Sequence, residues 1–290
     1  MATYTITDIS YFPGTESLKS TLYKCLCYKL PPRIWMCTLF TKSNICVNRA
    51  WNIAGPRKIP KGINMTSIPP VVLKASVKHS ATMIFLHGLG DTGFGWAGAL
   101  NTIRPKYMKI VCPTANSIPV TCNGGMSMPA WYDILDINAI GGKREHLESL
   151  EASSANLDLL IEQEEYEVPR NRIILGGFSQ GGALALHNVL KNKDRTLGGA
   201  IALSAYIAGG DVPSLNGPKL TTPLLQVHGE IDEIVPYSRG VEASNILKEL
   251  FSQFRFKGYP HMGHEGSSEE MQLLKDFIQD FVPPIETTST

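Results

Sequence analysis

The chain has 290 residues, of which 43% are hydrophobic and 18% are charged, and its formal net charge at pH 7 is +1. This composition is typical of a globular protein with a sizeable core, and the length allows one large domain or one domain with an appendage. Beyond residue 64 the chain carries 18 basic and 24 acidic residues, and such a mildly acidic body argues against nucleic acid as a partner.

The first 64 residues form a basic segment with nine Lys or Arg and two acidic residues. They show no clear hydrophobic periodicity, and we expect a disordered N-terminal extension. An organelle-targeting presequence remains an alternative, although Lys outnumbers Arg and Pro31-Pro32 interrupts any helix. A third reading is adsorption to a membrane, with Cys25 and Cys27 as palmitoylation sites. Met65 directly follows this segment and is a candidate start of the protein.

The cysteines and the apolar runs indicate the cellular compartment in which the protein is expected. Only Cys112 and Cys122 lie beyond residue 64, so the body has no disulfide framework, and no Cys/His set has the spacing of a zinc site. No apolar run reaches the roughly 20 residues of a membrane span. The N-terminus also lacks the apolar centre of a secretory signal. We therefore expect a cytoplasmic protein, with peripheral membrane association as an open alternative.

From about Val71 onward, short apolar runs typical of strands alternate with helical patterns. The expected strands cover residues 82–86, 109–112, 172–175, 200–203, 224–227 and 254–256, and the expected helices lie around 147–161, 183–190 and 274–281. Ser267 and Glu270 have the spacing of a capping box before the last helix. This alternation predicts an α/β fold over residues 65–290, with a mostly parallel sheet covered by helices on both faces.

The stretch GGFSQGG places one serine among four glycines, directly after the expected strand at 172–175. Gly177, Ser179 and Gly181 match the nucleophile elbow Gly-x-Ser-x-Gly, in which a tight strand-to-helix turn exposes the serine. The expected helix at 183–190 completes the strand, turn and helix that this motif requires. Because reactive groups in such sheets lie at the carboxyl ends of strands, Ser179 is the candidate nucleophile.

A nucleophilic serine needs a general base, and the base needs an acid that orients it. Asp232 and His264 each follow an expected strand, and they occur in the order that this fold class uses. Taken alone, Asp232 is more typical of a turn or helix cap, and a loop histidine is more often solvated. Three suitable residues at strand ends in the expected order favour a Ser179–His264–Asp232 triad.

An acyl-transfer site also needs donors for the oxyanion of the tetrahedral intermediate. The N–H of Gln180, directly after the nucleophile, is one candidate. The glycine-rich loop His87–Gly93 supplies the second, which we assign to the N–H of Leu89. A phosphate-binding loop is disfavoured because its Lys and following Ser/Thr are missing. This chemistry requires no metal and no organic cofactor.

The segment Val120–Tyr132 is rich in glycine, methionine and aromatic residues. Met126, Met128 and Trp131 have the adaptable apolar side chains that would line a channel for a fatty chain. The same residues are equally suited to a structural loop that packs them into the core. The sequence alone leaves these two interpretations open.

Several of these motifs together resemble the acyl-protein thioesterase/lysophospholipase family. The resemblance covers about residues 68–284, and it implies an α/β-hydrolase fold, the Ser179–Asp232–His264 triad and an acyl channel. One departure is Phe94, where the family leads us to expect His, and residues 1–64 have no counterpart that we can place. The motifs that carry the resemblance are Phe85–Gly93, Trp131-Tyr132-Asp133, Gly177–Gly182, the loop His228–Pro236 and Met262-Gly263-His264.

The resemblance implies a serine hydrolase that acts on palmitoyl-cysteine thioesters of proteins, on lysophospholipid esters, or on both. S-acylated proteins and lysophospholipids are therefore the expected partners. A short-chain carboxylesterase with the same triad is one alternative, and a non-catalytic acyl-binding protein is another. The sequence gives no indication of the oligomeric state.

Overall fold

A computed structural model describes residues 67–137, 139, 144–210 and 217–285, together with the backbone of four short strands within residues 3–51. The chain divides into two compact units, Met1–Pro60 and Lys61–Thr290. Each unit is described by itself.

The N-terminal unit contains one antiparallel sheet with its strands in chain order. The expectation of a disordered extension over residues 1–64, with a domain beginning at residue 65, stays a prediction. The side chains of Cys25 and Cys27 lie outside the described residues, so their lipidation is equally untested. The four strands are β1 (Thr3–Thr5), β2 (Lys24–Leu30), β3 (Ile34–Phe40) and β4 (Cys46–Trp51).

The second unit is built on a seven-stranded sheet in the order β13-β12-β11-β10-β6-β7-β5. All of its neighbouring strands run parallel except the edge pair β5 and β7. The predicted α/β fold with a mostly parallel sheet is therefore confirmed. Its strands are β5 (Val71–Leu73), β6 (Ala81–Leu86), β7 (Met108–Cys112), β10 (Ile173–Phe178), β11 (Gly199–Leu203), β12 (Leu224–Gly229) and β13 (Phe254–Tyr259).

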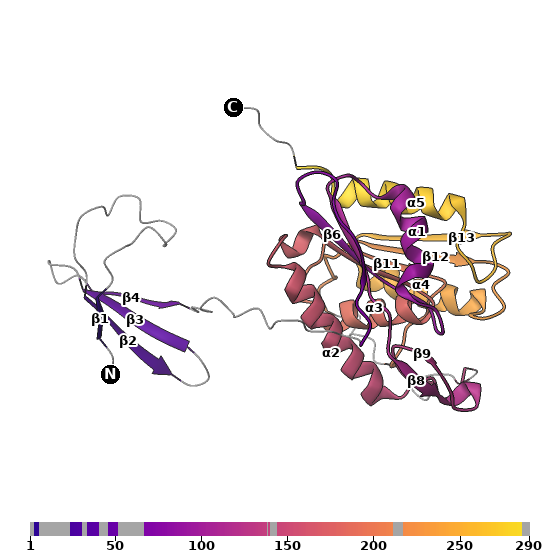
Figure 1. The fold of residues 1–290 in the computed structure, drawn as a ribbon, viewed down its shortest axis with the longest axis horizontal. Helices are drawn as coiled ribbons and strands as arrows, with labels where there is room; N and C mark the ends of the chain where they lie inside the picture. Colours follow the sequence, from indigo (N-terminus) through magenta and orange to yellow (C-terminus); the bar gives the residue numbers. More distant parts are fainter. Residues whose placement is uncertain are drawn as a thin grey trace. The chain divides into compact units, whose positions relative to one another are not determined.

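Helices cover both faces of this sheet (Figure 1). Helices α1 and α5 share one apolar core with one face of the strands, and α2, α3 and α4 share a second core with the other face. Within β6, Met83 and Phe85 enter the first core while Ile84 and Leu86 enter the second, as the two-residue period of a strand requires. The helices are α1 (Gly93–Ile103), α2 (Leu147–Glu164), α3 (Gln180–Lys191), α4 (Tyr237–Leu250) and α5 (Ser268–Phe281), with short 3₁₀ turns at Thr121–Asn123 and Arg170–Arg172.

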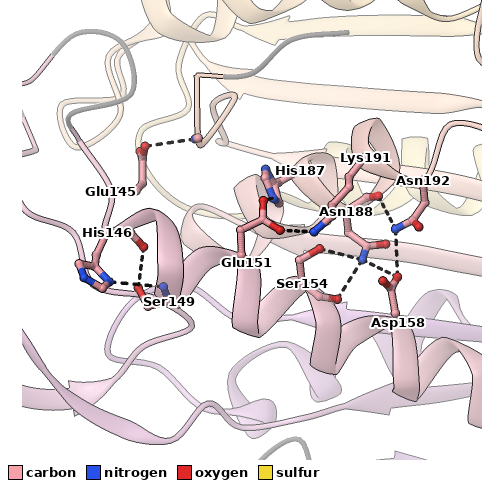
Figure 2. A network of polar contacts seen from close by, with 11 residues as sticks. Glu145, His146, Ser149, Glu151, Ser154, Asp158, His187, Asn188, Lys191 and Asn192 are labelled. Atoms are coloured by element: carbon pink, nitrogen blue, oxygen red, sulfur yellow. Dashed lines mark hydrogen bonds and ion pairs between the residues drawn. The ribbon is translucent and has the colours of Figure 1, made fainter.

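Polar side chains fix α2 against α3 (Figure 2). The buried amide of Asn188 donates to the carbonyl and hydroxyl oxygens of Ser154 at 3.2 and 3.1 Å and to Asp158 Oδ1 at 2.9 Å. Asn192 reaches the same Asp158 oxygen at 3.0 Å. Because a buried amide that loses its partners is costly, these bonds disfavour any slippage of one helix along the other.

A small antiparallel hairpin projects from the sheet between β7 and α2. It pairs β8 (Ser117–Val120) with β9 (Met126–Pro129), where sequence analysis treats the region only as a loop. Gly124 and Gly125 adopt φ values of 66° and 78°, which glycine reaches without steric cost. The hairpin touches the rest of the domain where the Gly90 N–H donates to the Pro129 carbonyl at 2.8 Å.

Candidate active site

The strand β10 and the helix α3 meet at Ser179 in a very tight turn. Ser179 has φ 52° and ψ −120°, a backbone conformation that non-glycine residues rarely adopt. A Cβ on Gly177 would lie 2.4 Å from the Gly181 carbonyl carbon, and one on Gly181 would lie 2.4 Å from the Leu86 carbonyl oxygen. The turn therefore requires glycine on both sides of the serine. The spacing Gly-x-Ser-x-Gly predicts this strand, turn and helix.

The side chains of Ser179, His264 and Asp232 form a continuous hydrogen-bonded series. His264 Nε2 lies 3.0 Å from Ser179 Oγ, and His264 Nδ1 lies 2.7 Å from Asp232 Oδ2. A carboxylate only accepts, so Nδ1 carries the proton and Nε2 is free to accept from the serine hydroxyl. The three residues follow β10, β12 and β13, and their strand ends bring them together at one edge of the sheet.

Asp232 uses both carboxylate oxygens. Its Oδ1 accepts the N–H groups of Ile234 and Val235 at 2.9 and 2.8 Å, while Oδ2 accepts from His264. Burial disfavours the charged carboxylate, but the hydrogen bonds from His264 and from these backbone groups outweigh it and hold the pKa of Asp232 below its usual value. Asp232 is therefore ionised at neutral pH, as an acid that orients an imidazole must be.

The imidazole of His264 also rests against an aromatic side chain. The ring of Phe178 lies 4.7 Å from it, centroid to centroid, and Trp96 follows 5.0 Å beyond Phe178. Phe178 is the residue between Gly177 and Ser179, so the serine turn itself supplies this support. The contact restricts the rotation of a ring that is otherwise fixed only at its two nitrogens.

The two candidate oxyanion donors come from segments beside Ser179. Gln180 is the first residue of α3, where backbone N–H groups have no acceptor within the helix. Leu89 lies in a turn closed by the Asp91 N–H to Gly88 carbonyl bond at 3.2 Å. A Cβ on Gly88 would lie 3.5 Å from Ser179 Cβ, so this turn approaches the serine closely. Among the residues described, the Leu89 N–H donates to no acceptor.

The three candidate acyl-channel residues occupy different environments. Met126 is 65% exposed and Met128 is half-buried on the same hairpin strand, whereas Trp131 is only 5% exposed. Their contact with substrate stays a prediction. Phe94, which departs from the resembled family, is 74% exposed in the first turn of α1.

Among the described residues, one cluster outside this site has potential metal ligands. His79, Glu164 and Glu167 bring their ligand atoms within 4.8 Å of one another. However, Lys109 Nζ lies 2.6 Å from Glu164 and 2.9 Å from Glu167, so its ammonium group already supplies the positive charge that the two carboxylates need. This cluster is better explained as an ion-pair network that ties β7 to the end of α2.

His87 is a buried polar residue to which sequence analysis assigned no role of its own. It follows β6 directly, and its Nδ1 lies 2.6 Å from the Gly88 carbonyl oxygen. Its Nε2 accepts the Ala115 N–H at 2.9 Å. Burial lowers the pKa of His87, which keeps the imidazole neutral. The sequence signal for the contact with the Gly88 carbonyl was the position of His87, directly between an expected strand and a glycine.

Comparison with known proteins places this arrangement among lipid and ester hydrolases. Residues 68–282 match the phospholipase/carboxylesterase family model. Acyl-protein thioesterase 1 of Neurospora crassa is 38% identical over 240 residues, which cover 76% of this chain and 95% of the relative. Acyl-protein thioesterase 1 homolog 1 of Dictyostelium discoideum is 36% identical over 217 residues, 73% of this chain and 95% of the relative.

A solved structure supports the same comparison at the level of the fold. The crystal structure of Zea mays acyl-protein thioesterase 2 superposes with a TM-score of 0.62 at 30% sequence identity. The match covers 73% of this chain and 98% of the maize protein. The residues that match the family model, 68–282, include Ser179, Asp232 and His264.

Proposed function

Because the chain belongs to the phospholipase/carboxylesterase family of α/β-hydrolases, we propose that it hydrolyses fatty-acyl thioesters on protein cysteines through Ser179, His264 and Asp232. It is an enzyme of the esterase and thioesterase type, as its acyl-protein thioesterase relatives indicate. The observation that carries the proposed residue roles is the hydrogen-bonded series from Ser179 Oγ to His264 at 3.0 Å and on to Asp232 at 2.7 Å.

The reaction proceeds in two steps. His264 Nε2 takes the hydroxyl proton as Ser179 Oγ attacks the thioester carbonyl, and the carbonyl oxygen becomes an oxyanion that the Leu89 and Gln180 N–H groups stabilise. The C–S bond then breaks, and the cysteine sulfur leaves as a thiol after His264 returns the proton. Water, deprotonated by the same imidazole, finally releases the fatty acid and restores Ser179.

The ionised carboxylate of Asp232 favours the imidazolium that forms in each step and holds the ring in the productive tautomer. An acyl ester of a lysophospholipid would pass through the same steps with an alcohol as the leaving group.

In the part of the chain that the structure describes, none of the helices has the length and hydropathy of a transmembrane segment. We also propose that the enzyme acts in the cytoplasm.

The test is hydrolysis of a palmitoyl-cysteine peptide, combined with labelling by an alkyl fluorophosphonate, which reacts only with an activated serine. Ser179→Ala removes one hydroxyl, so we expect an intact fold, no labelling and a turnover lower by several orders of magnitude. Ser179→Ala protein that still hydrolysed the thioester would exclude Ser179 as nucleophile. Parallel assays with a lysophospholipid rank the two substrate classes.

A matched pair of histidine variants tests the base. His264 contacts both Ser179 and Asp232, whereas His261, three residues earlier in the same loop, is exposed. We expect His264→Ala to be nearly inactive and His261→Ala to keep at least about a tenth of the wild-type rate. The reverse pattern would assign the base to His261.

A further inference from the structure

The peptide unit that carries the Leu89 N–H is fixed from its carbonyl side. His87 Nε2 accepts the Ala115 N–H, so this nitrogen is unprotonated and the ring proton sits on Nδ1. Nδ1–H therefore donates to the Gly88 carbonyl oxygen, 2.6 Å away. In a planar trans peptide the C=O and N–H bonds point in opposite directions. Anchoring the Gly88 oxygen on His87 thus directs the Leu89 N–H away from His87.

A single tryptophan joins this loop to the other candidate donor. The indole Nε1–H of Trp131 donates to the His87 carbonyl at 2.8 Å. The backbone N–H of the same residue donates to Gln180 Oε1 at 3.0 Å, and Gln180 Nε2 donates to the Tyr132 carbonyl at 2.8 Å. Trp131 is therefore bonded on one side to the residue before the Gly88–Leu89 peptide and on the other to the first residue of α3.

All of these bonds lie out of contact with water. His87, Gln180 and Trp131 are 1%, 1% and 5% exposed, and the rings of His87 and Trp131 lie 4.9 Å apart. Trp131 is also held from α2, where Ser153 Oγ donates to its carbonyl. Because buried hydrogen bonds hold their geometry and are costly to break, this set forms one stiff unit.

We propose that Trp131 is a positioning residue of the oxyanion hole, acting through His87 and through the side-chain amide of Gln180. This inference rests on the proposed function, in which Leu89 and Gln180 supply the two N–H donors. An oxyanion hole lowers the barrier only when its donors are aimed before charge develops. Trp131 ties together two donor segments that belong to distant parts of the sequence, and it thereby fixes the distance between the two N–H groups.

A purely structural role for Trp131 predicts a different outcome, and Trp131→Phe separates the two. Phenylalanine keeps most of the apolar ring and removes the Nε1–H. We expect kcat for a palmitoyl thioester to fall about tenfold, a fraction of the 10²–10³ that deleting an oxyanion donor costs, with KM nearly unchanged. The inhibition constant of an alkylboronic acid, whose serine adduct mimics the tetrahedral anion, should rise by a similar factor.

The control is Tyr206→Phe. The Tyr206 hydroxyl bonds to the Tyr132 hydroxyl at 2.9 Å, so this variant also deletes a buried hydrogen bond to the Trp131 segment, without touching His87 or Gln180. We expect Tyr206→Phe to lower the melting temperature while kcat and the boronate constant stay at wild-type values. If folded Trp131→Phe protein behaves like Tyr206→Phe, Trp131 is a core residue and the inference is wrong.

Gln180→Met provides a second route should Trp131→Phe fail to fold. It removes both side-chain amide bonds but retains the backbone N–H that acts as donor. We expect the same selective loss in kcat and boronate affinity, and an unchanged kcat would overturn the inference. Where both variants fold, the double variant should lose less than the product of the single losses, since both break one unit. Ser179→Ala keeps the two hypotheses apart: activity in that variant refutes the proposed function itself.

Discussion

At the residue scale, the buried carboxyl group of Glu270 is unusual for a residue in the first turn of a helix. Its side chain is 0% exposed, and neither carboxyl oxygen makes a hydrogen bond of normal geometry. Burial raises its pKa to about 8, although the nearby N–H of Ser267 offsets part of this effect. Glu270 is thus protonated in the fold at neutral pH, beside the loop that carries His264.

We predict that this carboxyl makes stability depend on pH. The unfolded chain releases the proton near the ordinary value of 4.5, whereas the fold retains it to about 8. Stability from the neutral form is therefore complete below about 4.5 and declines as the pH rises to about 8, by at most about 1.4 kcal/mol per pH unit. Glu270→Gln stays neutral, so its melting temperature should exceed the wild-type value by a margin that grows across this window.

The control for that series is Glu269→Gln, which removes an exposed carboxyl from the same turn. Melting curves at half-unit pH steps should show no growing margin for this variant. A margin for Glu270→Gln that was constant from pH 4.5 to 8 would mean that Glu270 ionises in the fold as it does in the unfolded chain.

For Glu270 and Asp232, the sequence predicts only part of the contacts that the structure shows. The spacing of Ser267 and Glu270 predicts a helix start, and Ser267 Oγ does accept the Glu270 N–H at 3.0 Å. The reciprocal bond, from the Ser267 N–H to the buried Glu270 carboxyl, is not formed with normal geometry. For Asp232, the sequence suggests a turn cap and a partner of His264 as alternatives, and its two carboxylate oxygens fill both roles.

At the scale of elements, the β8–β9 hairpin carries two of the methionines that are candidates for an acyl-binding site. Met126 and Met128 are two residues apart on β9, so their side chains lie on the same face of the strand. Met128 approaches the loop that carries the proposed oxyanion donor, with its sulfur 3.8 Å from where a Cβ on Gly90 would lie. The acyl-channel interpretation predicts that a fatty chain bound to Ser179 runs along this face and contacts both methionines.

We predict that replacing both methionines by serine lowers the preference for long acyl chains. Each CH₂ taken out of water contributes about 0.8 kcal/mol, so four methylenes against this face contribute about 3 kcal/mol, roughly a hundredfold in kcat/KM. The measurement is the ratio of kcat/KM for C12 and C4 p-nitrophenyl esters. Ser127→Ala, on the opposite face of β9, should leave the ratio unchanged. An unchanged ratio with a lower melting temperature in the double variant would assign the methionines a structural role.

Most elements with strong periodicity were predictable, and several elements stabilised mainly by packing were not. The apolar runs identified β6, β7, β10, β11, β12 and β13, and β10 extends to Phe178 only because the glycines of the elbow continue the strand. Helix α1 was missed because its sequence contains three glycines, which disfavour an isolated helix; it forms against β7 and α5. Helix α4 was missed although Ala243, Leu247 and Leu250 carry a helical pattern.

At the scale of the whole molecule, every residue proposed for the reaction lies in the second unit, which begins at Lys61. Its first described residues are already attached to the hydrolase body, since the backbone and hydroxyl of Ser67 donate to Asn116 Oδ1 at 2.8 and 3.0 Å. The catalytic unit therefore has its own core and its own N-terminal attachment.

We predict that a chain beginning at Met65 folds and hydrolyses soluble esters with the kcat/KM of the full-length protein. Its main unfolding transition should occur at the same temperature, because none of the described core residues lies before Met65. The comparison requires both proteins in one buffer, assayed with a C4 ester and melted in parallel. A truncated chain that failed to fold would place the domain boundary earlier than residue 65.

The alternation of strands and helices predicted a parallel sheet, but not the order of its strands. Strand β10 lies between β6 and β11, so the chain crosses from β7 back over the sheet before it forms the serine turn. Such crossovers depend on which faces of the sheet still need helices to cover them. This is a property of the packed layers and not of any single segment. The contact of Trp131 with both His87 and Gln180 was equally inaccessible, since it joins three separate segments.

The position of β13 at the edge of the sheet makes the proposed triad depend on a single strand pairing. Strands β6, β10, β11 and β12 lie in the interior of the sheet, and Ser179 and Asp232 follow two of them. The proposed base lies in the loop after β13, and β13 pairs only with β12 among the described strands. Local detachment of this edge strand would therefore withdraw His264 from Ser179 and Asp232 while the serine turn between β10 and α3 stayed in place.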